Sequence, residues 1–229
     1  MYNNYFENVY SKFWVETSKK YGMEDGINSI IEILQKLHGE SAFELGIGTG
    51  WPIAYSLEKS GVKMSGCDIS ESLIKQAQEA YPNMELFVGS IWDMGSRFSK
   101  KYDIVYCIRS SWYMKDFPRV VKTMLEMTKS NGYVVFNIIN RYNKQNRKAL
   151  ARNRFLHIKG RIEGALKVLL FNRDYFSVCP AFYYTRSEIE ETLRTENVKW
   201  KVLSTNQLLD SKAEFEEQGQ KLLFIVQKQ

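Results

Sequence analysis

The chain has 229 residues, of which 44% are hydrophobic and 25% are charged, and its formal net charge is +6 at pH 7. This length and balance suit one globular domain with a sizeable core, and no apolar run approaches the roughly 20 residues of a membrane span. Three scattered cysteines argue against a disulfide framework and favour the cytoplasm, and two histidines without partners at ligand spacing argue against a metal site.

The first 38 residues are predicted to form a helical cap, with helices over 6–20 and 24–37. The first helix carries an aromatic stripe that includes Tyr10 and Trp14. Such a stripe can simply pack a helix, but an electron-rich ring can also stabilise a bound cation. We therefore consider both a packing role and a binding role for Tyr10 and Trp14.

The stretch 42–50 is the most informative motif, because an apolar run ends at Glu44 and alternate glycines follow. Glycines allow a tight turn and a close approach of backbone to ligand, at the carboxyl edge of a parallel sheet. Their spacing does not fit the dinucleotide fingerprint. The carboxylate favours a cofactor that carries an amino group and a sulfonium over a pyrophosphate. An ordinary strand-to-helix turn is the alternative.

The second and third strands end in further polar residues. Asp68 closes the strand 63–68 and lies 18 residues after Gly50, close to the roughly 20 expected for an acid that holds ribose hydroxyls. The alternative is that Asp68 or Ser70 only caps the following helix. Ser90, Ile91 and Trp92 follow the third strand, and Trp92 could equally be a core residue.

A fourth strand over 102–108 leads into the loop 109–114, and a helical pattern over 120–129 precedes a turn and a fifth strand near 133–136. These five elements, over about residues 41–139, resemble the class I S-adenosylmethionine-dependent methyltransferases, and the loop resembles the small-molecule branch. The resemblance implies an α/β fold: a doubly wound, mostly parallel seven-stranded sheet (Rossmann-like) with N-terminal helices and an insertion after strand five.

The resemblance also implies a cofactor, S-adenosyl-L-methionine, with S-adenosyl-L-homocysteine as product. Asp68 matches the acid that binds both ribose hydroxyls, and the segment from Ser90 matches the one that closes over the adenine. The family often has Asp where this chain has Ser90. The residues expected to bind the cofactor are Tyr10, Trp14, Glu44, Gly46, Gly48, Thr49, Gly50, Asp68, Ile69, Ser90, Ile91, Trp92, Cys107 and Ile108.

The remaining chain divides into an insertion and an ending, so that one methyltransferase domain covers 1–229. Residues 39–140 form the cofactor-binding half, 141–185 a lid-like insertion, and 186–229 a final helix with two antiparallel strands. Thr185 or Ser187 is expected to cap that helix. Long insertions in compact domains are usually functional or disordered, and in this family they commonly cover the acceptor site.

The insertion begins with a strongly basic stretch that contains no acidic residue between Arg141 and Arg161. It could grip an anionic small molecule, attract RNA or DNA, lie on an anionic membrane, or be a solvated helix face. We favour the small anion over nucleic acid and membrane. Arg109, Arg147 and Arg152 are the substrate-binding candidates.

The sequence thus predicts a cytoplasmic enzyme that methylates an N or O atom of a small polar, anionic acceptor, either phosphorylated or linked to a nucleotide or sugar. A hydroxyl acceptor would need a general base, and no histidine lies in the expected loops. Tyr113 and Tyr184 are the candidate catalytic partners. The alternatives are a methyltransferase of RNA or lipid and a non-catalytic cofactor-binding module. The oligomeric state is not fixed by the sequence.

Overall fold

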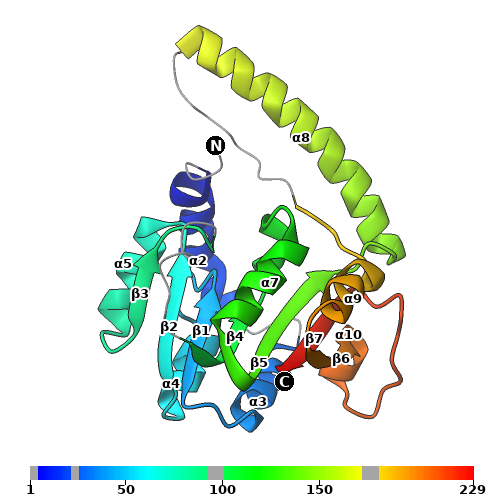
Figure 1. Cartoon of the computed structure of the whole chain (residues 1–229). Helices are drawn as coiled ribbons and strands as arrows, with labels where there is room; N and C mark the ends of the chain where they lie inside the picture. Colours follow the sequence, from blue (N-terminus) through cyan, green and yellow to red (C-terminus); the bar gives the residue numbers. More distant parts are fainter. Residues whose placement is uncertain (1–4, 22–25, 92–100, 172–180) are drawn as a thin grey trace.

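The structure is a computed structural model that describes residues 5–21, 26–91, 101–171 and 181–229. Its centre is a seven-stranded sheet with the order β3-β2-β1-β4-β5-β7-β6 (Figure 1). Strand β7 runs antiparallel to both of its neighbours, β5 and β6, and the other strand pairs are parallel. The strands are β1 (Ser41–Leu45), β2 (Lys63–Asp68), β3 (Glu85–Val88), β4 (Tyr102–Cys107), β5 (Thr128–Ile139), β6 (Val198–Ser204) and β7 (Lys221–Lys228).

Helices cover both faces of the sheet because successive strand residues point to opposite sides. Val105 packs with Phe117 of one helical layer, whereas Ile104 packs with Ile30 of the other. The helices are η1 (Phe6–Tyr10), α2 (Ser11–Tyr21), α3 (Ile27–Lys36), α4 (Ile53–Lys59), α5 (Glu71–Ala80), η2 (Ser111–Tyr113), α7 (Phe117–Met127), α8 (Lys144–Phe171), α9 (Arg186–Arg194) and α10 (Thr205–Leu209). The predicted doubly wound, mostly parallel seven-stranded sheet is confirmed.

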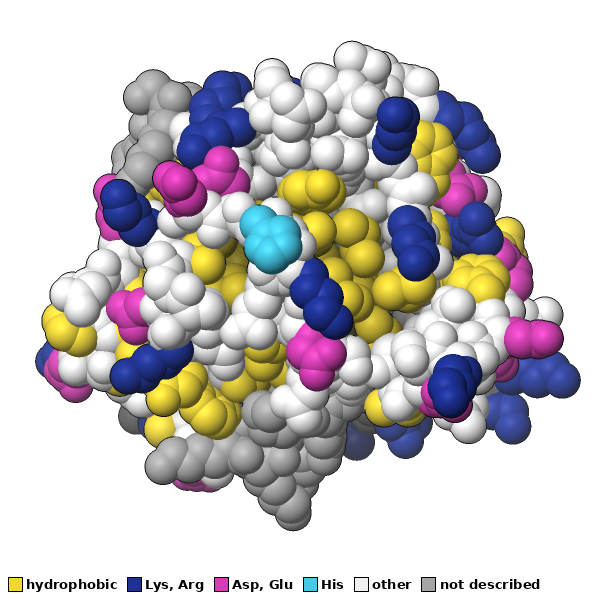
Figure 2. Space-filling model, turned by 90° about the horizontal axis from the view of Figure 1, so that it is seen from below, with side chains coloured by type: hydrophobic (Ala, Val, Ile, Leu, Met, Phe, Trp, Pro, Cys, Tyr) yellow, Lys and Arg dark blue, Asp and Glu magenta, His cyan; other side chains and the backbone are white. Residues whose placement is uncertain are grey.

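The sheet register fixes the residues that matter at the carboxyl edge. Glu44 in β1 lies opposite Tyr106 in β4 and Gly66 in β2. Asp68 ends β2, one strand away. Figure 2 shows the opposite side of the molecule, seen from below, with hydrophobic patches among charged side chains. Glu44 and Asp68 thus lie on neighbouring strands at the carboxyl edge of the sheet.

Several element boundaries differ from the sequence expectation for local reasons. The expected turn before the fifth strand is instead part of β5, where Asn131 has φ of 64° and the pairing with β4 shifts register between Tyr102 and Ile104. Of the two expected caps of the final helix, Thr185 is the one observed, because Thr185 and Glu188 form a capping box and Ser187 lies inside α9. Helix α10 is not predicted, since its five residues are too few to show a periodicity.

Helix α8 occupies most of the predicted insertion and arches over the carboxyl edge of the sheet (Figure 1). Its first turn is anchored to the loop before β7. Asn146 Nδ2 donates to the carbonyls of Asn140 and Gln220, at 2.8 and 2.6 Å, and Asn143 Nδ2 donates to the carbonyl of Gln218. Among the described helices, none is long and apolar enough to cross a lipid bilayer.

Candidate functional site

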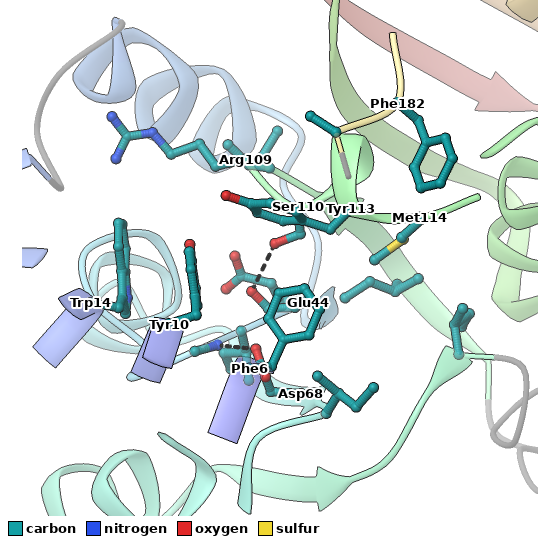
Figure 3. A pocket seen from close by; sticks show the side chains of 18 of the residues that line it. Phe6, Tyr10, Trp14, Glu44, Asp68, Arg109, Ser110, Tyr113, Met114 and Phe182 are labelled. Atoms are coloured by element: carbon teal, nitrogen blue, oxygen red, sulfur yellow. Dashed lines mark hydrogen bonds between the residues drawn. The ribbon is translucent and has the colours of Figure 1, made fainter. Parts of the chain in front are cut away.

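A cavity of about 960 Å³ opens at the carboxyl edge of the sheet. Its floor comes from the ends of β1, β2 and β4, and its walls come from the N-terminal segment, the loop after β4 and α8. In Figure 3, Phe6, Tyr10 and Trp14 project from the N-terminal segment toward Glu44, Asp68 and Tyr113. The site thus joins parts of the chain that are distant in sequence.

Glu44 is a buried carboxyl group on the floor, with 6% of its surface exposed. The Tyr106 hydroxyl donates to Glu44 Oε2 at 3.0 Å. Burial raises the pKa of Glu44 well above its ordinary value, the Tyr106 hydrogen bond lowers it, and nearby Asp68 raises it further. A cationic ligand group beside Glu44 would favour the ionised form, so the floor is suited to an ammonium.

This raised pKa has a consequence for stability. The folded protein keeps a proton on Glu44 at pH values where the unfolded chain has lost it, so this group's stabilisation is present below the ordinary carboxyl pKa of 4.5 and is lost as the pH rises toward the folded pKa. We expect Glu44→Gln to remove that decline. Denaturant unfolding of both proteins from acidic to neutral pH checks this, and parallel pH profiles would contradict the buried, protonated state.

Asp68 holds the glycine loop against the end of β2. Its Oδ2 accepts from Gly48 N at 2.9 Å, and its Oδ1 accepts from Ser70 N at 3.0 Å. Burial raises the pKa of Asp68, and the backbone N–H groups of Ser70 and Gly48 lower it. Ser70 caps α5, because its hydroxyl accepts from Leu73 N, so the capping role considered for this pair of residues belongs to Ser70.

The glycines of the loop are required by their surroundings. Gly46 has φ of 74°, and a Cβ placed there would lie 2.3 Å from Ser110 Oγ and 2.6 Å from Ser110 Cβ. Gly48 has φ of 56°, and a Cβ there would lie 3.2 Å from the indole Nε1 of Trp14. Ser110 and Trp14 thus pack directly against the loop, and neither glycine position has room for a side chain.

An aromatic cluster forms the wall opposite the glycine loop. Tyr10 stacks on Trp14 with the ring centroids 6.2 Å apart, and Tyr113 meets Tyr10 and Phe6 edge to face at 5.5 and 5.4 Å. Glu7 fixes this wall, since its carboxylate accepts from Ser70 Oγ at 2.7 Å and from Ser72 N at 3.1 Å. Aromatic rings thus surround the space above Glu44.

The loop after β4 is held in an unusual conformation. Arg109 has φ of 65°, which is uncommon for a residue with a side chain. Asn137, buried in β5, stabilises it by accepting from Arg109 N through Oδ1 at 2.9 Å, and the Ser111 hydroxyl donates to the Asn137 carbonyl. This places the Arg109 side chain along the cavity (Figure 3).

Cationic side chains also line the cavity. Arg109, Lys115 and Arg154 all line it. Arg141 lines it as well, but its guanidinium donates to the Tyr183 carbonyl and to Glu188 Oε1. The acidic groups Glu44 and Asp68 come from β1 and β2, so the cavity carries carboxyl groups on its floor and cations along the loop after β4 and α8.

Cys67 also belongs to the wall, at the end of β2 between the two acidic residues. Its side chain is buried, with 3% of its surface exposed. Burial raises the pKa of the Cys67 thiol to about 12, and nearby Asp68 adds to the effect. The thiol is therefore neutral at physiological pH.

Most of the residues predicted from the sequence come together here. Those that line the cavity are Tyr10, Trp14, Glu44, Gly46, Gly48, Asp68, Ile69, Ser90, Ile91, Ile108, Arg109, Tyr113 and Tyr184. The Tyr184 hydroxyl accepts from Phe117 N and donates to the Met114 carbonyl, at 3.1 and 2.8 Å, so its polar atom is already engaged.

Other predicted residues lie elsewhere. Thr49, Gly50 and Cys107 are not among the lining residues; Gly50 N donates to the Ile47 carbonyl and shapes the turn. Arg147 and Arg152 are exposed on α8, outside the cavity lining. Trp92 lies outside the described residues.

Sequence reasoning missed four residues that the structure brings to the site or its support: Trp51, Lys115, Asn137 and Arg154. Trp51 lines the cavity, and its indole N–H is buried without a partner among the described residues. Its place directly after the last motif glycine was the available signal. Lys115 and Arg154 carried no such signal, because their positions depend on the course of η2 and α8.

Metal ligands do not gather within the described ranges, where no three His, Cys, Asp or Glu side chains could hold an ion. The chemistry of the cavity is instead that of paired carboxyl groups, aromatic rings and cations. Such a set can bind a ligand that carries positive charge at one end and can recognise an anion at the other.

Comparison with known proteins gives a consistent result. Residues 43–136 match a family model described as a methyltransferase domain. A ubiquinone biosynthesis O-methyltransferase from Hydrogenovibrio crunogenus is 26% identical over 149 residues, which cover 61% of this chain and 60% of that protein. The chain spans about half the length of several other curated relatives that it matches.

Solved structures share the fold over nearly the whole chain. An S-adenosylmethionine-dependent methyltransferase from Clostridium acetobutylicum superposes with a TM-score of 0.64 at 15% identity, covering 96% of this chain and 99% of that one. Magnesium protoporphyrin IX methyltransferase from Synechocystis, with bound S-adenosylmethionine, gives 0.64 at 14% identity, covering 99% and 95%. At such identities the likeness shows the fold alone.

Proposed function

Because this chain belongs to the class I S-adenosylmethionine-dependent methyltransferases, we propose that it transfers a methyl group from S-adenosylmethionine to a nitrogen or oxygen atom of a small, polar, anionic acceptor. One observation supports the acceptor class: a single cavity is lined by carboxyl groups from β1 and β2 and by cations from the loop after β4 and from α8. The carboxyl groups suit a cationic cofactor, and the cations suit an anionic acceptor.

The residues present fit this cofactor. Glu44 is a buried carboxyl group that accepts a hydrogen bond from Tyr106 and retains acceptor capacity for an ammonium. Gly46 and Gly48 line the cavity with backbone alone, which a ligand can approach closely. Asp68 lies where the ribose hydroxyls would be held, and Ile69 and Ile91 offer apolar faces to the adenine.

When bound, the cofactor supplies an activated methyl group on a sulfonium. The protein's part is to align the acceptor with that group and to exclude water. Tyr10 and Tyr113 present rings to the sulfonium and the reacting atoms, and the Tyr113 hydroxyl is a candidate hydrogen-bond partner for the acceptor. Trp14 covers the glycine loop, and Trp51 Nε1 is available to a polar atom of the cofactor.

The acceptor would lie against Arg109, Lys115 and Arg154, beneath the start of α8. We propose that 141–185 is the part of this single domain that covers the acceptor, since Leu150 and Arg154 reach the cavity from α8. We also propose a cytoplasmic location, which the free, buried thiols of Cys67 and Cys107 support.

Methyl transfer can be tested directly. The protein is incubated with S-adenosylmethionine labelled in the methyl group and with a cytoplasmic extract, which is then separated into small molecules, nucleic acid, protein and lipid. Label in an anionic small molecule supports the proposal. Label only in RNA, protein or lipid overturns the acceptor class, and no transfer despite measured cofactor binding overturns the activity for the acceptors that the extract contains.

Once an acceptor is known, Lys115→Gln and Arg154→Gln test whether the cations that line the cavity bind it. Each change removes one charged contact to an anion, which is worth roughly 1.5–3 kcal/mol, so we expect the KM for the acceptor to rise about tenfold or more. Steady-state kinetics with saturating cofactor measure this. Lys199→Gln, on the exposed side of β6, is the matched control. An unchanged KM in both cavity variants would contradict the assignment.

A further inference from the structure

Helix α8 has two faces of different character. One face points to the protein: Asn146 is buried, and Leu150 lines the cavity. The other face is exposed, and it combines cations with large apolar side chains. We call it the outer face of α8, and it consists of Lys144, Lys148, Arg152, Phe155, Ile158, Lys159 and Ile162.

The spacing of these residues places them on one side of the helix. Lys148 follows Lys144 by four positions, and Phe155 and Ile162 follow at intervals of seven, which is close to two turns each. Phe155, Ile158 and Ile162 are exposed by 68%, 59% and 57%. Three large apolar residues this exposed on one helix face are more than the scattered single ones found on ordinary protein surfaces.

The charge on this segment is of one sign. No aspartate or glutamate occurs from Lys144 to Ile162. A helix that carries lysine and arginine beside phenylalanine and isoleucine matches the interface of an anionic bilayer, where the cations meet lipid headgroups and the apolar side chains enter the acyl boundary. Long basic side chains can reach the headgroups while their methylene stems lie along the apolar residues.

We propose that the outer face of α8 docks the protein on anionic membrane surfaces. The helix lies parallel to the surface and does not cross it, in agreement with its many charges. This inference does not depend on the identity of the acceptor. The cations divide between two tasks: Arg154 lines the cavity, whereas the outer face meets the lipid.

Two other occupants fit the outer face less well. A second copy of the chain would bring two basic faces together, and like charges repel. Single-stranded nucleic acid is held by aromatic rings interleaved with cations, and Phe155 is the one aromatic residue on this face. An anionic bilayer can bind the cations through its headgroups and bury the isoleucines at its acyl boundary.

Vesicle flotation tests the proposal with the full chain. One set of vesicles is phosphatidylcholine alone, and the other is phosphatidylcholine mixed with phosphatidylglycerol. We expect binding to the mixed vesicles only. Phe155→Ser/Ile158→Ser/Ile162→Ser should abolish it, and Lys144→Gln/Lys148→Gln/Lys159→Gln should weaken it by about tenfold or more, since each basic residue near an anionic surface adds roughly 1 kcal/mol.

Matched controls separate docking from misfolding and from general surface charge. Leu209→Ser changes an exposed apolar residue elsewhere, and Lys63→Gln/Lys199→Gln/Lys201→Gln removes three exposed lysines. Both should bind vesicles like the wild type, and all variants should keep wild-type affinity for S-adenosylhomocysteine.

Three results would overturn the proposal. These are equal binding of both kinds of vesicle, retention of binding by both outer-face variants, and no vesicle binding at all. In the last case, dimerisation in ultracentrifugation or RNA binding that the outer-face variants lose would assign the surface to that partner. The proposed methyl transfer is measured separately, with soluble acceptors and no vesicles, so either can fail alone.

Discussion

Replacing Glu44 with glutamine is expected to weaken the binding of S-adenosylhomocysteine by roughly a hundredfold while the fold stays intact. Loss of a buried charge partner costs about 3 kcal/mol, which corresponds to a factor of this size in Kd. Glutamine keeps the shape of the side chain, and its amide oxygen can still accept from the Tyr106 hydroxyl. The change therefore removes the charge and little else.

Isothermal titration calorimetry measures this effect, and a second ligand makes it specific. 5′-Methylthioadenosine contains the adenosine and the sulfur but no amino acid group. If Glu44 binds the ammonium, the variant loses affinity for S-adenosylhomocysteine and keeps its affinity for methylthioadenosine. An equal loss for both ligands would mean that Glu44 acts by holding the loop. Glu40→Gln, an exposed carboxylate just before β1, serves as the matched control.

Gly46→Ala is expected to have the largest effect on the fold. The added methyl group would lie 2.3 Å from Ser110 Oγ and 2.6 Å from Ser110 Cβ, and φ at this position is 74°. A side chain at positive φ costs about 1 kcal/mol, and overpacking adds roughly 1–3 kcal/mol. We therefore expect the free energy of unfolding to fall by about 3 kcal/mol and cofactor binding to be lost, because the loop moves away from Asp68.

The chain provides a control that separates the two costs. Gly61 also has positive φ, at 90°, but a Cβ there meets nothing within 4 Å. Gly61→Ala should therefore lose only about 1 kcal/mol. Gly46→Ala/Ser110→Gly should recover the overpacking part, which a double-mutant cycle of urea unfolding measures. If Gly46→Ala costs no more than Gly61→Ala, the close contact with Ser110 is refuted.

The sequence predicted the site residues correctly where a single strand sets both the position of a residue and its chemical type. Each apolar strand of the parallel part ends at a residue whose place at the carboxyl edge follows from the topology, as for Glu44 and Asp68. The glycine spacing likewise indicated the tight loop after β1. Thr185, one of two candidate caps, marked the start of α9. These features depend on local sequence and on one general rule of sheet geometry.

The cations that line the cavity could not be predicted in the same way. Charge alone did not distinguish Arg154, which lines the cavity, from Arg147 and Arg152, which are outside its lining. The difference depends on the rotation and direction of α8, which are set by Asn143 and Asn146 bonding to the loop before β7. The role of Asn137 could not be predicted either, since it supports the backbone of Arg109 from the neighbouring strand.

The burial of Cys67 has a chemical consequence for a protein that holds an alkylating cofactor. A thiolate is a strong nucleophile, and a sulfonium methylates strong nucleophiles within reach. With a pKa of about 12, only about one Cys67 side chain in a hundred thousand is ionised at pH 7. Burial of Cys67, with a further contribution from neighbouring Asp68, thus also protects the enzyme from methylating itself.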